Sequence, residues 1–215
     1  MNKNISEDFA QNYDKYVVEN GWFSPEILLG LCHPYITAGQ KLLDIGIGTG
    51  LSSIHFKKAG LEITGIDNSD YMLAICRSKQ ICKELVLHDI SDLPLPFEDK
   101  SFDIVIANGI FHLTGSLSYI VTEINRLLKE NGIFAFTVDI LQNKDKMSYK
   151  ETDIPGLWLL HNKEYDFNLY KHTQSLVLNE LSDQQFRVLK SVNFRAFDDK
   201  KEQRTVYFDA FVTKK

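Results

Sequence analysis

The sequence predicts an α/β protein with a doubly wound, mostly parallel sheet. Two observations favour this fold class. Short apolar segments alternate with segments of helical periodicity over residues 41–140, as expected where helices connect parallel strands by right-handed crossovers. A glycine-rich turn at residues 46–50 directly follows the first apolar segment, which is typical of α/β folds that bind a ligand at their strand ends. We therefore expect a Rossmann-like sheet with helices on both faces.

Seven segments have the composition of strands. Five of them are short and apolar, as buried parallel strands are. The last two are β-rich and separated by a charged turn at Asp198–Lys201, so we expect them to form an antiparallel pair at one edge of the sheet. The expected strands are residues 41–45, 61–67, 85–87, 102–107 and 133–138, followed by 186–197 and 205–213.

Helical spacing and capping signals predict the helices. An amphipathic helix should open the chain, because apolar residues recur at helical spacing from Phe9 to Val17. Ser24 followed by Pro25 indicates an N-cap with proline at the first helical position of a second helix. Further helices are expected over residues 51–59, from an N-cap at Ser69, from 117 to a close at Asn131–Gly132, and over 175–181.

We interpret the 215 residues as one domain, since that length fits one domain better than two. Long connections inside a compact domain are usually functional, and residues 141–172 form such a connection, rich in aromatic side chains. The expected parts are an N-terminal helical cap (1–40), a ligand-binding core (41–140), this inserted lid (141–172), and a C-terminal helix with a β-hairpin (173–215).

The charge and the apolar pattern exclude several classes of protein. The formal net charge of −5 disfavours a protein that binds nucleic acid by neutralising phosphates. No apolar run is long enough to cross a bilayer, and the polar, acidic residues 1–14 do not resemble a secretory signal. We expect a cytoplasmic protein that binds neither membranes nor nucleic acid; the oligomeric state stays open.

The three cysteines do not indicate a metal site. Cys32, Cys76 and Cys82 show neither a CxxC pattern nor an even number. All three fall in segments expected to be helical. We interpret them as buried, reduced thiols, and we expect no bound metal.

The turn after the first strand is the strongest functional signal. It begins with Asp44 at the strand end and carries Gly46, Gly48 and Gly50, which let the backbone turn tightly and approach a ligand. A nicotinamide-dinucleotide fingerprint needs its last glycine one place later. Leu51 occupies that place, so an oxidoreductase is disfavoured.

Polar residues also end the next three strands. Asp67 ends the second strand, where a carboxylate can accept both hydrogens of a ribose diol. Asp89 ends the third, where it can accept from an adenine amine, with the N–H of Ile90 facing a ring nitrogen. Asn108 follows the fourth strand. Because ligands of open α/β sheets bind beyond the carboxyl ends of the strands, we expect these residues to form one site.

Four segments carry a resemblance to a known family. Residues 42–50, 65–73, 93–103 and 123–132 look like the successive motifs of the class I S-adenosylmethionine-dependent methyltransferases. The resemblance spans about residues 41–139 and depends on the motifs occurring in this order.

The resemblance implies S-adenosylmethionine as cofactor and S-adenosylhomocysteine as product. It implies that Asp44 and the three glycines line the methionyl part, that Asp67 holds the ribose, and that Asn108 lies beside the sulfonium. The adenine would be flanked by Asn68 and fixed by Asp89 and Ile90. Tyr13 matches a position in related enzymes where an N-terminal helix folds over the cofactor, and ordinary helix packing explains it equally well.

The expected reaction is methyl transfer to an oxygen, nitrogen or sulfur atom of a small-molecule acceptor. Binding and orientation can carry such a displacement without a catalytic triad, and the sequence shows none. If a general base is needed, His112 is the first candidate and His172 the second; a packed histidine is the alternative for both. A non-catalytic S-adenosylmethionine-binding module that regulates a partner is the alternative function.

Overall fold

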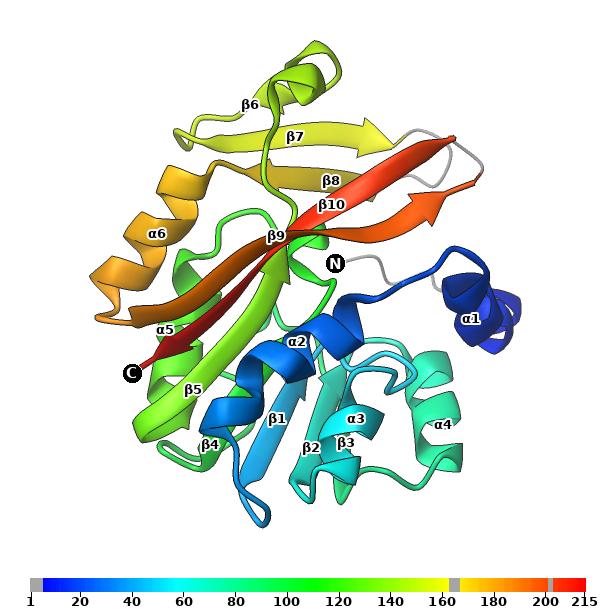
Figure 1. Ribbon diagram of the computed structural model, residues 1–215, viewed down its shortest axis with the longest axis vertical. Helices are drawn as coiled ribbons and strands as arrows, with labels where there is room; N and C mark the ends of the chain where they lie inside the picture. The colour runs from blue at the N-terminus through cyan, green and yellow to red at the C-terminus, as the bar shows by residue number, and fades with distance from the viewer. Residues whose placement is uncertain (1–5, 163–166, 201–202) are drawn as a thin grey trace.

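The computed structural model describes residues 6–162, 167–200 and 203–215 and shows a seven-stranded sheet between two layers of helices (Figure 1). The strand order is β3-β2-β1-β4-β5-β10-β9. The strands β1 to β5 pair in parallel, whereas β10 runs antiparallel to β5 and β9. The predicted fold class, including the antiparallel edge pair, is confirmed. The strands are β1 (Lys41–Ile45), β2 (Glu62–Asp67), β3 (Glu84–Leu87), β4 (Phe102–Ala107), β5 (Leu128–Val138), β9 (Arg187–Asp199) and β10 (Arg204–Lys214).

Helices cover both faces of this sheet. Successive side chains of a strand point to opposite faces, so Leu42 packs with α2, α3 and α4 on one face and Leu43 packs with α5 and α6 on the other. The α-helices are α1 (Glu7–Glu19), α2 (Ser24–Cys32), α3 (Ser53–Lys58), α4 (Asp70–Ser78), α5 (Ser118–Leu127) and α6 (Gln174–Asp183), and the 3₁₀ helices are η1 (His33–Tyr35), η2 (Phe111–Leu113) and η3 (Asn143–Met147).

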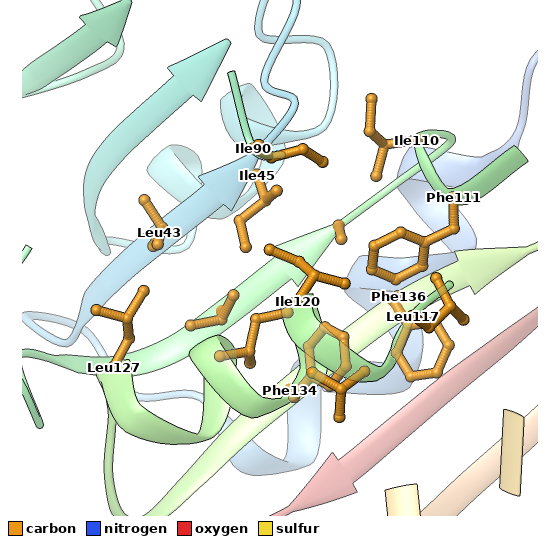
Figure 2. Close-up of a cluster of buried hydrophobic side chains, with 14 of the residues drawn as sticks. Leu43, Ile45, Ile90, Ile110, Phe111, Leu117, Ile120, Leu127, Phe134 and Phe136 are labelled. Atoms are coloured by element: carbon orange, nitrogen blue, oxygen red, sulfur yellow. The ribbon is translucent and has the colours of Figure 1, made fainter. Parts of the chain in front are cut away.

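Aliphatic and aromatic side chains fill the core between the sheet and α5 (Figure 2). Phe136 of β5 stacks on Phe134 with ring centroids 4.5 Å apart and on Phe211 of β10 at 5.2 Å. Phe111 of η2 meets the edge of Phe136 at 5.6 Å. All four side chains are at most 1% exposed. This packing fixes the positions of the strand β5 and of the segment after β4, and that segment contains the site candidates Asn108 and His112.

The inserted segment forms a second, small sheet. Its strands β6 (Lys150–Glu151), β7 (Leu157–Asn162) and β8 (Phe167–His172) are antiparallel. The small sheet lies beyond the carboxyl end of β5 (Figure 1), and a bridge between Ile140 and His172 joins β8 to the chain leaving β5. The insertion was expected, but its strands were not, because its polar and apolar residues do not alternate regularly.

Three local expectations are wrong. The helix α5 ends at Leu127 rather than at Asn131–Gly132, because Leu128 turns into strand geometry and pairs with Phe102. Phe23 occupies the N-cap of α2, and the Ser24 hydroxyl donates to Asn108 instead of capping the helix. Cys82 lies in the turn after α4 and not in a helix.

Two features of the described residues are relevant to the membrane and metal expectations. None of the helices there is both long and apolar enough to span a membrane. Within residues 6–162, 167–200 and 203–215, no three or more His, Cys, Asp or Glu side chains are grouped so that they could hold a metal ion.

The core packing predicts a large effect of truncating Phe136. Phe136→Ala should lower the free energy of unfolding by about 3–5 kcal/mol, because the surrounding rings cannot collapse into the space. Tyr119→Ala on the outer face of α5, where the side chain is 75% exposed, should change it by less than about 0.5 kcal/mol. Urea unfolding of both variants measures this. Equal losses in the two would contradict the assigned packing.

Candidate functional site

The carboxyl ends of β3, β2, β1 and β4 lie side by side, in that order, at one edge of the sheet. This is the edge at which open α/β sheets bind ligands. A short segment follows each of these strands, and each segment contains candidate site residues predicted from the sequence. The segments are 46–52 after β1, 68–69 after β2, 88–90 after β3 and 108–110 after β4.

The glycine turn after β1 needs its glycines for two reasons. Gly46, Gly48 and Gly50 have φ values of +70°, +55° and +86°, a region that other residues rarely adopt. A Cβ at Gly46 would stand 2.8 Å from Ile110, and one at Gly50 would stand 2.6 Å from Ile81. At Gly48 a Cβ would meet no atom within 4 Å. The turn therefore packs tightly beneath its first and last glycines and is open at the middle one.

Asp67 joins the end of β2 to this turn. Its carboxylate accepts hydrogen bonds from the backbone N–H of Gly48 and of Ser69, both at 2.9 Å. The side chain is 6% exposed, and burial raises its pKa above the usual range. An ionised carboxylate has about four acceptor sites, so Asp67 keeps capacity for further donors such as hydroxyl groups.

Asp44 lies beneath the turn. The Ser53 hydroxyl donates to Asp44 Oδ2 at 2.7 Å, and the carboxyl group is 2% exposed. Burial raises its pKa to about 7, although the Ser53 hydrogen bond opposes the shift. The protonation of Asp44 is therefore sensitive to a positive charge brought close to it.

Asp89 and Asn68 meet beyond β2 and β3. The Asn68 amide donates to Asp89 Oδ2 at 3.2 Å, and Ser91 donates to Oδ1 through its N–H at 3.0 Å and its hydroxyl at 2.7 Å. Burial opposes ionisation of Asp89, but these hydrogen bonds outweigh it and lower the pKa. Ile90 is 4% exposed and packs into the core below them.

The helix α1 is fastened to the glycine turn. Asp14 accepts hydrogen bonds from the Thr49 hydroxyl, at 2.5 Å, and from the Lys79 ammonium group of the turn after α4. Next to it, burial and the carboxylates of Asp14 and Asp67 raise the pKa of Tyr13 to about 12. Tyr13 thus lies within electrostatic reach of Asp67. The contacts of Asp14 were not predicted from the sequence.

Asn108 connects three elements at the end of β4. Its Oδ1 accepts from the hydroxyls of Ser24, at 2.6 Å, and Thr137, at 2.8 Å, while its amide donates to Ser52 at 2.9 Å. The residue therefore ties α2 and β5 to the glycine turn. At the following Gly109, with φ +69°, a Cβ would stand 2.5 Å from the Trp22 ring, so the indole packs directly against the backbone there.

The two candidate bases have different surroundings. His112 of η2 stacks on Phe208 at 6.2 Å, and burial, with the charge of Lys171, lowers its pKa to about 4. His172 of β8 is fully buried, and its Nε2 donates to the Gly115 carbonyl at 2.9 Å. Within the described part of the chain, its Nδ1 has no hydrogen-bond partner. His172 holds the small sheet to the core, and a catalytic role for it stays a prediction.

A buried charge cluster beside these histidines was missed. The Lys171 ammonium lies 2.9 Å from Asp139 and 3.0 Å from Asp145, and 5.4 Å from the centre of the Tyr149 ring. Lys171 is 7% exposed, and losing either acid would leave a buried charge incompletely paired. The cluster fastens the small sheet to the end of β5. The sequence does not predict this cluster, because a single lysine in a strand does not indicate which acidic residues will lie near it.

Comparison with known proteins identifies the family of the core. The family profile described as "Methyltransferase domain" matches residues 43–136. The chain is 30% identical over 164 residues to a demethylmenaquinone methyltransferase of Thermotoga maritima, covering 72% of this chain and 70% of that protein. A solved S-adenosylmethionine-dependent methyltransferase of Methanosarcina mazei superposes with a TM-score of 0.72 at 20% identity, covering 86% of this chain and 96% of the other.

Other matches are shorter. The chain spans about two-fifths of the length of several curated relatives. One of them is a malonyl-[acyl-carrier protein] O-methyltransferase of Serratia marcescens, which is 30% identical over 109 residues, covering 51% of this chain and 40% of the relative. The extent of the Thermotoga match, together with the shared fold, is decisive. The chain belongs to the class I S-adenosylmethionine-dependent methyltransferase family.

Proposed function

We propose that the protein transfers a methyl group from S-adenosylmethionine to an oxygen, nitrogen or sulfur atom of a small-molecule acceptor. One observation carries this proposal. The buried Asp67 carboxylate bonds to Gly48 at the open middle of the glycine turn and keeps acceptor capacity there. A relative named for demethylmenaquinone supports a small-molecule acceptor, and a relative named as a malonyl-[acyl-carrier protein] O-methyltransferase supports an oxygen atom as the methyl acceptor.

The residues at the strand ends suit the chemistry of the cofactor. Asp67 would accept from the ribose hydroxyls, and Asp89, with the N–H of Ile90 and the flanking Asn68, would hold the adenine. Asp44 and the turn of Gly46, Gly48 and Gly50 would line the methionyl part, whose amine is positively charged. Tyr13 of α1 would cover the cofactor, and Asn108 would lie beside the sulfur.

The chain supplies binding, orientation and exclusion of water. When bound, the cofactor supplies a methyl group activated by a positively charged sulfur. Fixing the acceptor in line with that group can account for up to roughly 7–11 kcal/mol of the barrier. The small sheet and α1 would enclose the acceptor, the small sheet held by the buried ion pair of Lys171 with Asp139 and α1 by the partly exposed contacts of Asp14.

His112 orients the acceptor in this proposal. With a pKa of about 4 the imidazole is neutral at physiological pH, so it can accept a hydrogen bond from a hydroxyl, thiol or amine. A base this weak removes a proton efficiently only as the acceptor becomes acidic during methyl transfer. His112 therefore acts mainly on the position of the acceptor atom.

A binding and turnover experiment tests the function. Calorimetry should detect binding of S-adenosylmethionine and S-adenosylhomocysteine and no comparable binding of NADH. Incubation with S-adenosylmethionine and fractionated metabolites should yield S-adenosylhomocysteine and a product of higher mass by one methylene. Tight NADH binding without any response to S-adenosylmethionine would overturn the proposal. Cofactor binding without turnover in any fraction would instead favour a non-catalytic binding module.

Removing the carboxylate of Asp67 should weaken cofactor binding. Asp67→Ala is expected to cost about 1–3 kcal/mol of binding free energy, because hydroxyl donors would be left without a partner. Asp70→Ala changes an exposed carboxylate three residues away and should leave the affinity unchanged. Calorimetry with S-adenosylhomocysteine measures both. Unchanged affinity in Asp67→Ala, with the fold intact by circular dichroism, would show that the ribose lies elsewhere.

Asp44 should make cofactor binding depend on pH. Its pKa of about 7 means that the carboxyl is neutral below that pH and negative above it, and only the negative form attracts the cationic cofactor. The affinity should therefore rise through about pH 7, by at most about tenfold per pH unit below the pKa. Asp44→Asn should remove this component, and the amine of the cofactor titrates identically with both proteins. Identical pH profiles for the two proteins would contradict the assignment.

His112 should titrate far below an ordinary histidine. Its imidazole signals in NMR spectra should shift with a midpoint near pH 4, because burial and Lys171 disfavour the charged ring. His112→Gln identifies the signals by their disappearance. A midpoint near the ordinary value of about 6.5 would mean that the ring is hydrated and could act as a conventional base.

A further inference from the structure

Two thiols meet in the turn that follows α4. The Sγ atoms of Cys76, in the last turn of the helix, and Cys82, beyond it, are 3.8 Å apart. The backbone bends back between them, where Lys79 N–H donates to the Cys76 carbonyl and Gln80 adopts a φ of +54°. The two sulfurs are therefore in contact because of a tight turn and not through a chance approach of distant segments.

The thiol pair opens onto the surface. A cavity of about 150 Å³ is lined by both cysteines, with Arg77 and Lys83 among its other residues. Cys82 is partly exposed, whereas Cys76 is fully buried behind it. The hydrogen bond between the two sulfurs lowers the pKa of Cys76, with help from Lys79 and against burial, and the same hydrogen bond, together with burial, raises the pKa of Cys82. Such a pair, one thiol accessible and the other acidic, is the arrangement in which disulfides form readily.

The third cysteine lacks these features. Cys32 is fully buried in α2, and burial raises its pKa to about 12. A fully buried thiol that oxidants in solution cannot reach is inert towards them. Cys32 is thus a matched control within the same chain.

The same turn supports the proposed cofactor site. Cys76 Sγ lies 2.9 Å, and Ile81 Cδ1 2.6 Å, from where a Cβ on Gly50 would stand, so both side chains pack directly under the last glycine of the turn after β1. Lys79, between them in sequence, holds Asp14 of α1. A change in the conformation of residues 76–82 is therefore expected to affect both the glycine turn and the position of α1.

We propose that Cys76 and Cys82 are a modification site, at which a reversible disulfide forms and weakens cofactor binding. Bonding brings the two sulfurs from 3.8 Å to about 2.0 Å. Because Cys76 packs under Gly50, movement of its sulfur removes packing from the glycine turn. Because Lys79 lies between the two cysteines in sequence, the same change moves its ammonium group away from Asp14. The effect on cofactor binding rests on the proposed function; the formation of the disulfide does not.

The chemistry needs a hydroperoxide as oxidant. The accessible Cys82 sulfur attacks the terminal oxygen of the peroxide, the O–O bond breaks, and Cys82 becomes a sulfenic acid, while the proton of its thiol passes to the other peroxide oxygen, which leaves in water or an alcohol. The Cys76 thiolate then attacks the Cys82 sulfur, the S–S bond forms, and the hydroxyl leaves as water with the proton of the Cys76 thiol. Two electrons pass from the thiols to the peroxide, and an added dithiol reverses the oxidation.

Mass spectrometry and calorimetry on the full chain test the proposal. Protein treated with hydrogen peroxide should lose the mass of two hydrogen atoms, and digestion should yield a peptide linked through Cys76 and Cys82. Its affinity for S-adenosylhomocysteine should fall by about fivefold or more, and dithiothreitol should restore both mass and affinity. Cys82→Ser should bind as the reduced protein does and stay insensitive to peroxide, whereas Cys32→Ala should behave like the unchanged chain.

Different outcomes separate the two proposals. A linkage that includes Cys32, or no linkage at all, would overturn the disulfide. A Cys76–Cys82 disulfide with unchanged S-adenosylhomocysteine affinity would overturn its coupling to the cofactor site while leaving the proposed function intact. Failure of the reduced protein to bind S-adenosylhomocysteine would overturn the proposed function, and the mass change would still decide on the disulfide.

Discussion

The contact between the Asp67 carboxylate and the N–H of Gly48 is the interaction on which the candidate site depends. It links the ends of two neighbouring parallel strands, β1 and β2, and it fixes the glycine turn with its open middle position. A buried carboxylate held by backbone donors resists reorientation, because moving it would strand those donors. The same group that shapes the turn therefore keeps its remaining acceptor sites directed at one place beyond the sheet.

Charged contacts help to hold α1 and the small sheet in place, whereas the large sheet and its helices are held together by apolar packing. Asp14 fastens α1 through Lys79 and Thr49, and Lys171 fastens the small sheet through Asp139 and Asp145. A partly buried ion pair stabilises the fold only while both charges keep their relative position, so movement of one partner removes that stabilisation. This difference suits an enzyme whose cofactor site stays rigid while an acceptor enters and leaves. The turn between Cys76 and Cys82 contacts both the glycine turn, under Gly50, and α1, through Lys79 and Asp14.

Local signals made the sheet and the strand-end residues predictable from the sequence. The strand, glycine turn and helix after Asp44 are encoded by adjacent residues, and the position of Asp67 follows from strand length. The charge ties were not predictable, because Lys79 lies 65 residues from Asp14 and Lys171 lies 32 from Asp139, and only the folded chain brings them together. The end of α5 at Leu127 was misplaced because pairing of Leu128 with Phe102 overrides the turn signal of Asn131–Gly132. Cys82 was misassigned because nothing local marks the bend before it.

A crystal structure of the protein with S-adenosylhomocysteine tests the central claim most directly. If the account is correct, the ribose hydroxyls will lie within hydrogen-bond distance of Asp67, the adenine beside Asp89, and the backbone of the glycine turn against the methionyl part. A nucleoside bound anywhere other than at the joined ends of β1, β2 and β3, with Asp67 still bonded only to Gly48 and its own loop, would contradict it.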